Sequence, residues 1–418
     1  MSDYEQVTSV PDDLTWAEAA AIADEYGPSF FLFDESRFRG NFLALRDAFL
    51  STYPRVAIGY SYKTNYTPHL CRIVHQLGGY AEVVSEMEYA LAKRLEIPGD
   101  RIVFNGPVKA PAAFADAARS GAILNLDSAR DLELLEETAA TADGGDIRAV
   151  IRCNFELSPG EISRFGVDVG SPEFRQMIHR IGALDGVRLA GLHCHFPDRD
   201  LDSFGRRAEQ MARLVKDVFT EAPPEILNIG GGYFSTMPES LRDKFAVPPA
   251  SFTDYAELVG PILISAFADG PQPPTLFLEP GTAIVADCFH FVTRVVSTKS
   301  IRGKHFATVA GSMFDISPMA RTRALPVRAL HQNPEVSALS SWDVAGYTCI
   351  EKDILSEGVM AALRNGDFLC YGNVGSYSVV MRPPFILPAN PILMRVGGEV
   401  RVLRDRQSME DVFHNFRF

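Results

Sequence analysis

The chain has 418 residues, of which 46% are hydrophobic and 22% charged, a composition typical of a soluble globular protein with a sizeable core. The net charge of −13 is spread along the chain without a basic stripe, which argues against nucleic acid and anionic membranes as partners. No apolar run approaches the roughly 18 residues of a membrane span, and the acidic N-terminus lacks a signal-peptide pattern, so we expect a cytoplasmic protein.

Strand-like and helical patterns alternate from about residue 55 to residue 282. Stretches such as 86–95, 110–121, 129–140 and 206–219 repeat apolar residues at intervals of three and four, as amphipathic helices do. Eight runs between and around them have the composition of buried strands, at residues 56–63, 80–85, 102–106, 122–128, 149–154, 189–196, 226–232 and 276–282. Eight strands alternating with helices predict an α/β fold, a parallel (β/α)8 barrel of the TIM type.

The eight strand-like runs all finish on polar residues or glycines. Carboxyl ends of barrel strands form one rim, where barrel enzymes carry the active site. Plain turn residues would produce the same pattern, and this alternative stays open. The set comprises Lys63, Ser85, Asn105, Asp127, Arg152 with Asn154, His195, Gly230 to Gly232, and Glu279.

After residue 283 the pattern changes to strand-like runs broken by glycine and proline. These runs occupy residues 289–300, 305–314, 342–350, 366–372, 376–383 and 392–405. They predict a C-terminal antiparallel β domain. We therefore place the barrel at 36–283 and the β domain at 284–418, and expect residues 1–35 to contribute a strand to the β domain through the run "SFFLFD".

Four rim features together describe a site for pyridoxal 5′-phosphate. Lys63 ends the first strand, where its amine can form a Schiff base with an aldehyde. The glycines at 230–232 expose backbone N–H groups suited to a phosphate. His195 is placed to stack on a flat ring, and Glu279 to pair with a protonated ring nitrogen. Each feature alone has a structural alternative: an ion-paired lysine, an ordinary turn or a core histidine.

The same motifs resemble a known family, the barrel-type (fold type III) pyridoxal phosphate decarboxylases acting on ornithine, arginine, diaminopimelate and carboxynorspermidine. "YSYKTN" is similar to the family's lysine motif and implies that Lys63 holds the cofactor. "GGYAEVVSEMEYALA" resembles another family segment, with Glu82 in place of the usual aspartate and Ser85 and Glu88 retained. "HCHF", "IGGG" and "EPG" carry the histidine, the phosphate loop and the glutamate. The resemblance covers nearly the whole chain and implies the alanine racemase-like fold.

Further matches imply residues beyond the four rim features. "SRFGV" resembles the family's K/R-F-G stretch and suggests Arg164 as a substrate residue. "GYTCIEKD" resembles the cysteine segment that the partner subunit supplies, which implies Cys349 as a catalytic acid and Asp353 near the substrate. "GSYS" is similar to the motif whose tyrosine, here Tyr377, lies near the cofactor. The resemblance thus implies a homodimer with composite active sites.

Several positions depart from the family pattern. Thr282 follows "EPG" where arginine is usual, "FPDRD" replaces a serine-bearing segment, and Ile350 stands where diaminopimelate enzymes have a glutamate. Asp315 and Arg321 are uncertain substitutes for residues usual at the start of the β domain. These departures argue against plain diaminopimelate decarboxylation.

The resemblance implies decarboxylation of an amino acid or derivative, of diamino acid or carboxyalkyl-polyamine type, through an external aldimine. Two alternatives stay open: an amino-acid racemase or epimerase with Tyr347 or Tyr377 as second base, and a non-catalytic cofactor-binding regulatory protein. No metal is expected, because the six cysteines show no CxxC pair. The expected partner is a small-molecule substrate besides a second copy of the chain.

Overall fold

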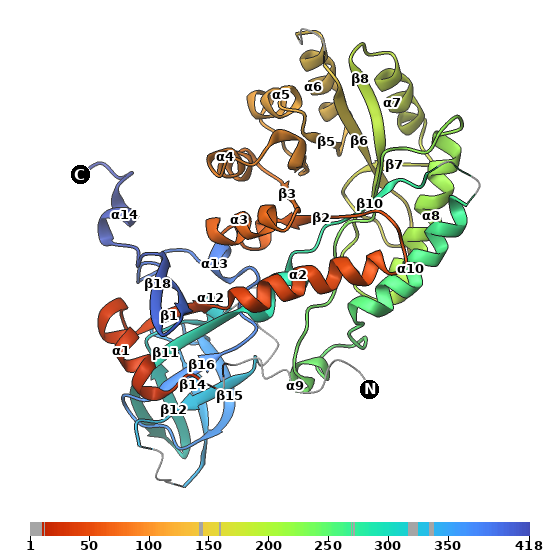
Figure 1. The fold of residues 1–418 in the computed structure, drawn as a ribbon. Coiled ribbons are helices and arrows are strands. Elements are labelled where there is room, and N and C mark those ends of the chain that lie inside the picture. The colour runs from red at the N-terminus through yellow and green to blue at the C-terminus, as the bar shows by residue number, and fades with distance from the viewer. Residues whose placement is uncertain are drawn as a thin grey trace. The chain divides into compact units, whose positions relative to one another are not determined.

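Contacts divide the chain into two units, each built around its own sheet (Figure 1). One unit comprises Arg39–Phe234 and Pro249–Ala283, and the other comprises the described residues up to Phe38 together with Ser235–Pro248 and Ile284–Phe418. The computed structural model describes residues 11, 13–141, 145–158, 160–268, 270, 272–316, 325–333 and 338–418.

The first unit is a closed parallel barrel. Its sheet runs in the order β5, β4, β3, β2, β10, β9, β8, β6, and pairing of β5 with β6 closes the ring. The two-residue strand β7 (Val167–Asp168) pairs in parallel with the end of β6. All eight predicted barrel strands are present among the described residues: β2 Val56–Ser61, β3 Tyr80–Val83, β4 Ile102–Phe104, β5 Ile123–Leu126, β6 Ile147–Asn154, β8 Val187–His193, β9 Ile226–Asn228 and β10 Thr275–Leu278.

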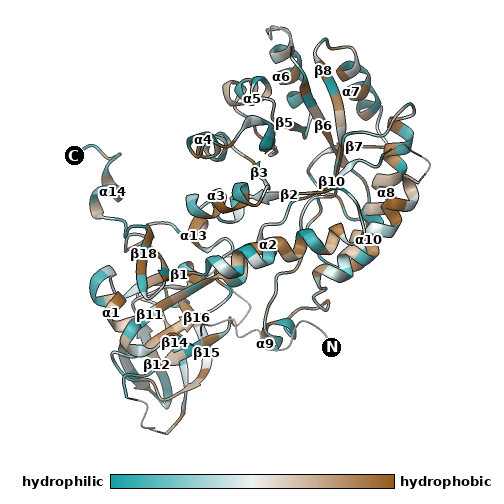
Figure 2. Ribbon diagram, in the orientation of Figure 1, coloured by the Kyte–Doolittle hydropathy of each residue, from teal (hydrophilic) through white to brown (hydrophobic). Residues whose placement is uncertain are grey.

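Amphipathic helices follow the strands on the outside of the barrel (Figure 1). They alternate hydrophilic and hydrophobic bands (Figure 2), because only one side of each packs against the sheet. Proline opens three of them and side-chain caps begin others, for example Asp200 before α8. The helices are α2 Glu35–Leu50, α3 Pro68–Gln76, α4 Glu86–Arg94, α5 Pro111–Arg119, α6 Ala129–Ala139, α7 Pro172–Gly182, α8 Leu201–Val218 and α10 Phe252–Ala266.

The barrel interior below the rim, toward the amino ends of the strands, is an apolar layer to which each strand contributes one side chain. Its members are Ala57, Tyr80, Val103, Ile123, Val150, Ala190, Ile226 and Phe277. Successive strand side chains alternate between faces, so residues two positions further along point into the same interior. At six of those eight positions the side chains are polar, and this second layer leads to the rim; the other two positions are Gly59 and Leu192.

The second unit is a mostly antiparallel sheet. Strand β11 lies between β1 and β12 and also pairs with β16, while β1–β17 and β12–β14 are parallel pairs. Helix α1 (Trp16–Tyr26) packs on this sheet over a buried apolar cluster. The strands are β1 Ser29–Phe33, β11 Phe289–Ile301, β12 Lys304–Val309, β13 Val327–Leu330, β14 Ser340–Ala345, β15 Ile354–Ala361, β16 Phe368–Tyr371, β17 Ile392–Val396 and β18 Glu399–Arg404. A barrel with such a sheet domain confirms the predicted fold class.

One predicted strand is wrong. The run 376–383 contains the short helix α13 (Ser378–Met381), preceded by Tyr377 in the left-handed region with φ +59°. Ser378 is buried and its hydroxyl donates to the carbonyl of Val374, a local contact that fits a helical turn. Sequence reasoning also missed β13 and β15. The remaining short helices are α9 Glu239–Arg242, α11 Thr282–Val285, α12 Met313–Ile316 and α14 Met409–Phe413.

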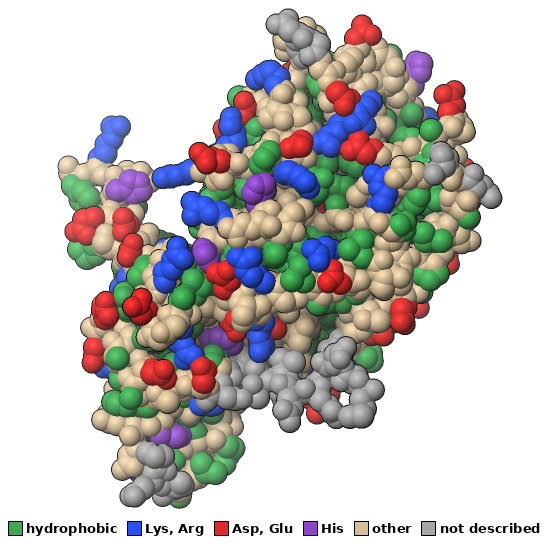
Figure 3. Space-filling view, in the orientation of Figure 1, with side chains coloured by type: hydrophobic (Ala, Val, Ile, Leu, Met, Phe, Trp, Pro, Cys, Tyr) green, Lys and Arg blue, Asp and Glu red, His purple; other side chains and the backbone are tan. Residues whose placement is uncertain are grey.

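Charged side chains of both signs are interspersed over the face drawn in Figure 3, in keeping with the absence of a basic stripe in the sequence. None of the helices in the described part of the chain has the length and apolar character needed to cross a membrane. The cytoplasmic location stays a prediction.

Close packing of β8 against β9 predicts a stability difference between two glycine substitutions. A Cβ at Gly191 in β8 would lie 2.1 Å from the carbonyl oxygen of Ile226, whereas a Cβ at the exposed Gly40 in α2 meets nothing within 4 Å. Gly191→Ala should lower the free energy of unfolding by about 1–3 kcal/mol. Gly40→Ala should raise it by about 0.5–1 kcal/mol. Urea unfolding of both variants measures this; an unchanged midpoint for Gly191→Ala would contradict the packing.

Candidate active site at the barrel rim

Lys63 lies in a single 3-10 turn, Tyr62–Thr64, directly after β2. Its Nζ is 2.6 Å from Oε2 of Glu82 and 3.4 Å from Oγ of Ser61. The Lys63 side chain is 37% exposed, while that of Glu82 is fully buried on β3. The lysine amine is thus reachable from outside and is held by a carboxylate from the neighbouring strand.

Glu279 follows β10 and accepts three hydrogen bonds inside the barrel. Its Oε1 accepts from the amide nitrogens of Asn105 and Asn228, each at 2.8 Å, and its Oε2 lies 3.1 Å from Nε2 of His193. Burial opposes ionisation of this carboxyl, but His193, the Lys63 charge and the Asn105 amide outweigh it and hold the pKa of Glu279 well below its usual range. Glu279 is therefore a buried, fully ionised carboxylate.

The glycine loop and His195 form one hydrogen-bonded unit after β9 and β8. The N–H of Gly231 donates to Nδ1 of His195 at 3.0 Å, so the ring proton resides on Nε2. Burial lowers the pKa of His195 well below its usual range, and the charges of Lys63 and Arg152 act in the same direction. His195 is a neutral, oriented imidazole.

Only glycine fits this loop. Gly230 and Gly232 have φ of +73° and +105°, and a Cβ at Gly231 would lie 2.2 Å from the carbonyl oxygen of Glu279. The Gly230 N–H donates to Oδ1 of Asn228 at 2.8 Å, so two of the three glycine amides have partners within the barrel unit. The Gly232 N–H has none among the described residues, which leaves it for an external acceptor.

Arg207 supports the glycine loop from behind. This fully buried side chain of α8 donates to the carbonyl of Gly231 at 2.8 Å and to those of Phe196 and Asp198 at 3.2 and 2.5 Å. Its Nε also bonds Oγ of Ser203 at 3.1 Å. The guanidinium therefore fixes the backbone after His195 to the backbone of the glycine loop.

A pocket of about 370 Å³ opens beside His195. Its walls include Phe165 and two arginines, with the guanidinium carbons of Arg164 and Arg152 lying 4.0 and 4.6 Å from the centre of the Phe165 ring. Arg152 is paired with Asp127 at 3.0 Å, whereas Arg164 is exposed. Arg164 thus stands at a pocket adjoining the rim.

Ser85 and Glu88, the two residues shared with the family segment, close the start of α4. Ser85 Oγ accepts the N–H of Glu88, and a Glu88 carboxylate oxygen accepts the N–H of Val84 at 2.8 Å. Burial raises the pKa of Glu88 to about 7. Their contacts are those of a helix cap that lies next to the lysine site.

Cys349 belongs to the sheet unit, in the loop between β14 and β15. It is exposed, whereas the other five cysteines are buried and free. Asp353 is buried at the end of this loop, where it accepts bonds from Ser312 Oγ at 3.0 Å, the Met313 N–H at 2.8 Å and the Thr348 N–H at 3.2 Å. Its carboxylate thus secures the loop, and a substrate role for Asp353 stays a prediction.

Asp315 has a buried ion pair that sequence reasoning did not find. Its partner is Arg382, which also donates to the Tyr347 hydroxyl at 3.0 Å, and Asn390 donates to the same carboxylate at 2.9 Å. Tyr377, half-buried, directly precedes α13, and Arg382 directly follows it. Arg321 lies outside the described residues.

Asn105 was predicted only as a rim residue and Glu82 only as part of a family segment, while Asn228 and His193 were not predicted as site residues at all. Three of these side chains lie two positions beyond apolar members of the interior layer: Glu82 after Tyr80, Asn105 after Val103 and Asn228 after Ile226. A polar residue at that offset was the available signal. Which of these polar groups meet depends on strand pairing, which the sequence does not display.

Comparisons with known proteins agree with this geometry. A family model described as "Pyridoxal-dependent decarboxylase, pyridoxal binding domain" matches residues 39–286, more than half of the chain. A diaminopimelate decarboxylase of Aquifex aeolicus is 28% identical over 409 residues, covering 93% of this chain and 91% of that protein. An L-glutamyl-(BtrI acyl-carrier protein) decarboxylase of Niallia circulans is 25% identical, with 96% of each chain covered.

Solved structures show the same fold. A diaminopimelate decarboxylase from M. jannaschii superposes with a TM-score of 0.84 at 22% identity, covering 95% of this chain and 94% of that one.

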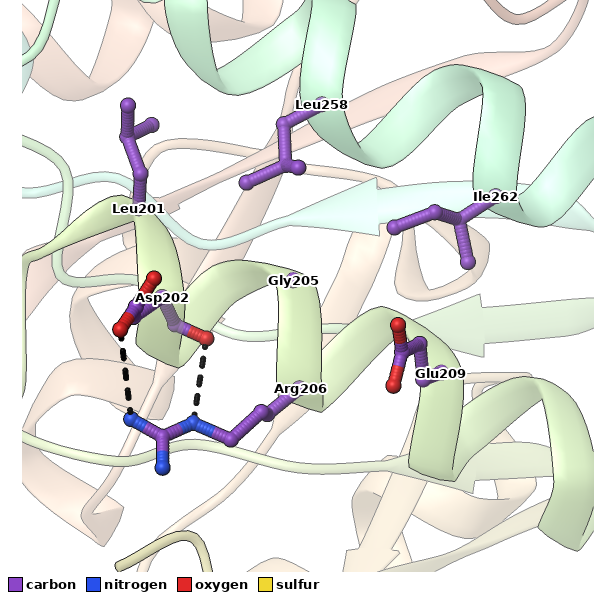
Figure 4. A pocket seen from close by; sticks show the side chains of 7 residues that line it. All are labelled: Leu201, Asp202, Gly205, Arg206, Glu209, Leu258 and Ile262. Atoms are coloured by element: carbon purple, nitrogen blue, oxygen red, sulfur yellow. Dashed lines mark hydrogen bonds and ion pairs between the residues drawn. The ribbon is translucent and has the colours of Figure 1, made fainter.

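Two neighbouring arginines of α8 provide a matched test of the loop support. Arg206 is exposed and lines a surface groove of about 480 Å³ between α8 and α10, where it contacts Asp202 (Figure 4), and it also donates to the carbonyl of Leu157 at 2.8 Å. Arg207→Met should lower the free energy of unfolding by about 2–4 kcal/mol, because three carbonyls lose their donor in a buried site. Arg206→Met should change it by about 0.5 kcal/mol or less. Equal losses in thermal and urea unfolding would contradict the assigned role.

Proposed function

We propose, from the premise that this chain belongs to the pyridoxal-dependent decarboxylase family, that it removes the α-carboxylate of an amino acid with the help of pyridoxal 5′-phosphate bound at the barrel rim. The observation that carries this proposal is the hydrogen-bonded chain from Lys63 through Glu82 and Asn105 to Glu279. It joins a reachable amine to an ionised buried carboxylate.

The residues at the rim fit this cofactor. Lys63 offers an amine for its aldehyde, and the glycine loop offers a close backbone approach and the Gly232 N–H for its phosphate. Neutral His195 suits the face of the ring, and Glu279 suits its nitrogen. Tyr377 is proposed as a further cofactor residue. When bound, the cofactor supplies an electron sink for the bond to the departing carboxylate.

The protein's own groups supply proton handling and orientation. Glu82, 2.6 Å from Lys63 Nζ, is close enough to take the proton that the lysine must lose before it acts as a nucleophile. Glu279, ionised and fixed by three donors, holds a proton at the ring nitrogen. Cys349 is proposed to return a proton to the carbon that has lost its carboxylate, a general-acid step typically worth about 10²- to 10⁴-fold.

Family membership confirms the decarboxylase prediction, and a racemase is not favoured. The substrate stays a proposal: a diamino acid or a carboxyalkyl polyamine, with Arg164, Asp315 and Asp353 as proposed contacts. Thr282 and Ile350 replace residues usual in diaminopimelate enzymes, although several relatives are named for that activity. A carbon dioxide release screen over diaminopimelate, other diamino acids, basic amino acids and carboxyalkyl polyamines tests this; release from none of them would contradict it.

We further propose that two chains assemble each active site. Cys349 is exposed on a loop whose Tyr347 hydroxyl bonds the carbonyl of Phe385 at 3.3 Å. Around this contact lie exposed apolar side chains, with Ile350 40%, Phe385 39%, Ile386 51% and Leu387 36% exposed. An apolar surface beside a thiol that has a catalytic assignment is suited to contact with a second copy.

Lys63→Ala should abolish both the visible absorption of lysine-linked pyridoxal and carbon dioxide release. The protein loaded with cofactor is measured by absorption spectroscopy and by turnover. Lys93→Ala is the control, because Lys93 also pairs with a carboxylate, Asp116, but lies 53% exposed on α4. A normal absorption band and full turnover in Lys63→Ala would show that a residue other than Lys63 binds the cofactor aldehyde.

Composite sites predict complementation between inactive chains. Lys63→Ala and Cys349→Ala subunits, each nearly inactive, should regain about one quarter of wild-type activity when mixed in equal amounts. About half of the dimers are then mixed, and each has one intact site. Subunit exchange is verified with differently tagged chains. Exchange without recovered activity would place both residues in one chain's site or remove Cys349 from catalysis.

A further inference from the structure

The polar layer inside the barrel contains the side-chain amide of Asn105, which lies between two carboxylates. Asn105 follows β4 and is 7% exposed. Its Nδ2 lies 2.8 Å from Oε1 of Glu82 and 2.8 Å from Oε1 of Glu279. One amide nitrogen therefore bridges the two carboxylates of the site.

The orientation of this amide is determined by its neighbours. A reversed Asn105 would direct its carbonyl oxygen at two carboxylates, so its nitrogen must face them. Its Oδ1 then accepts from Nδ2 of Asn125 at 2.5 Å, and Oδ1 of Asn125 is left without a partner among the described residues. When both N–H groups of Asn105 point toward the carboxylates, the buried Oδ1 of Asn125 is left without a hydrogen-bond donor among the described residues, which is unfavourable.

The two bridged carboxylates need these donors because both are buried. Glu82 is 0% and Glu279 6% exposed. Two carboxylates in one dry site repel each other, and without compensation one of them takes up a proton. Lys63 compensates Glu82 from one side, and Asn228 and His193 compensate Glu279 from the other. Two further titratable groups act on the pair. The buried carboxyl of Glu88 on α4, whose pKa burial raises to about 7, acts on Glu82 and Lys63. The His195 ring acts on Glu279. Asn105 donates to both carboxylates and stands between them.

We propose that Asn105 is a positioning residue that keeps Glu82 and Glu279 ionised at the same time, so that Glu82 serves Lys63 while Glu279 serves the ring nitrogen. This inference rests on the proposed function. The side-chain contacts of Asn105 among the described residues are with Glu82, Glu279 and Asn125 and not with the lysine amine, so it acts through the two carboxylates. Removing its donors should cause the carboxylate pair to bind a proton at higher pH.

The direction of the effect follows from the charges. In the native protein burial opposes ionisation of Glu279, but His193, Lys63 and the Asn105 amide hold the pKa of this carboxyl well below its usual range. Leucine has a volume similar to that of asparagine but no hydrogen-bond donor. In Asn105→Leu the proton affinity of the carboxylate pair therefore rises, and the acidic limb of the pH profile moves to higher pH. Asn105→Ser, with one remaining donor, should move it by a smaller amount. Asn125→Leu is the matched control, because Asn125 contacts Asn105 and neither carboxylate.

Three measurements on each variant test the proposal. They are the pH titration of the visible band of the cofactor-loaded protein, the acidic limb of kcat/KM, and the melting temperature of the cofactor-free protein against pH. For Asn105→Leu we expect a shift of about one pH unit or more in each, a tenfold change in proton affinity. For Asn125→Leu we expect less than half of that. A carboxylate whose pKa in the folded protein is raised takes up its proton at a higher pH during acidification. Its contribution to the free energy of unfolding is therefore lost at a higher pH than in wild type.

Two results would overturn the proposal. One is a titration of Asn105→Leu, or of Asn105→Ser if the leucine variant does not fold, that coincides with wild type. The other is an equal shift in Asn125→Leu, which would mean that packing of the polar layer is responsible. If wild-type protein binds no cofactor, the proposed function fails instead, and the cofactor-free melting curves still decide whether Asn105 controls the carboxylate pair.

Discussion

Pairing of β5 with β6 closes the barrel, and the site depends on this closure. The pairs Ile123 with Arg148 through Leu126 with Ile151 fix the register of the last gap in the sheet. A slip of one residue would turn Asn125 out of the interior. Closure also removes sheet edges and brings strand ends separated by more than 200 residues to one rim. The apolar layer then supports the polar layer two residues above it.

Closure creates an electrostatic difficulty that the polar layer resolves. Glu82 and Glu279 are carried into a dry interior, where an isolated ionised carboxylate is costly. Each receives its own cation or ring partner, and Asn105 provides a neutral bridge between them. Neutral bridging avoids a further buried charge. The half-exposed Lys63 is the one member of this hydrogen-bonded group that remains accessible for chemistry.

The sheet unit follows a different strategy, in which two buried carboxylates, one of them in an ion pair, hold an exposed loop. Asp353 secures the base of the Cys349 loop, and Asp315 with Arg382 secures Tyr347 within the same loop. The thiol of Cys349 is therefore exposed on a loop whose position is fixed by buried contacts. Functional residues commonly lie on loops that a rigid scaffold positions, and the role proposed for Cys349 accords with this principle.

Local patterns in the chain were enough to predict the barrel, the β domain, and Lys63, His195 and Glu279 as rim residues. Strand periodicity, glycine clusters and polar strand ends are properties of short segments, so they can be recognised from the sequence alone. The helix at Ser378–Met381 escaped this reasoning because a buried serine contact overrides the strand-like composition of its segment. The pairing of Glu82 with Lys63, the bridge made by Asn105 and the support from Arg207 were visible only after folding. Each joins residues on different elements, and strand register and closure, which no short segment encodes, decide which of them meet.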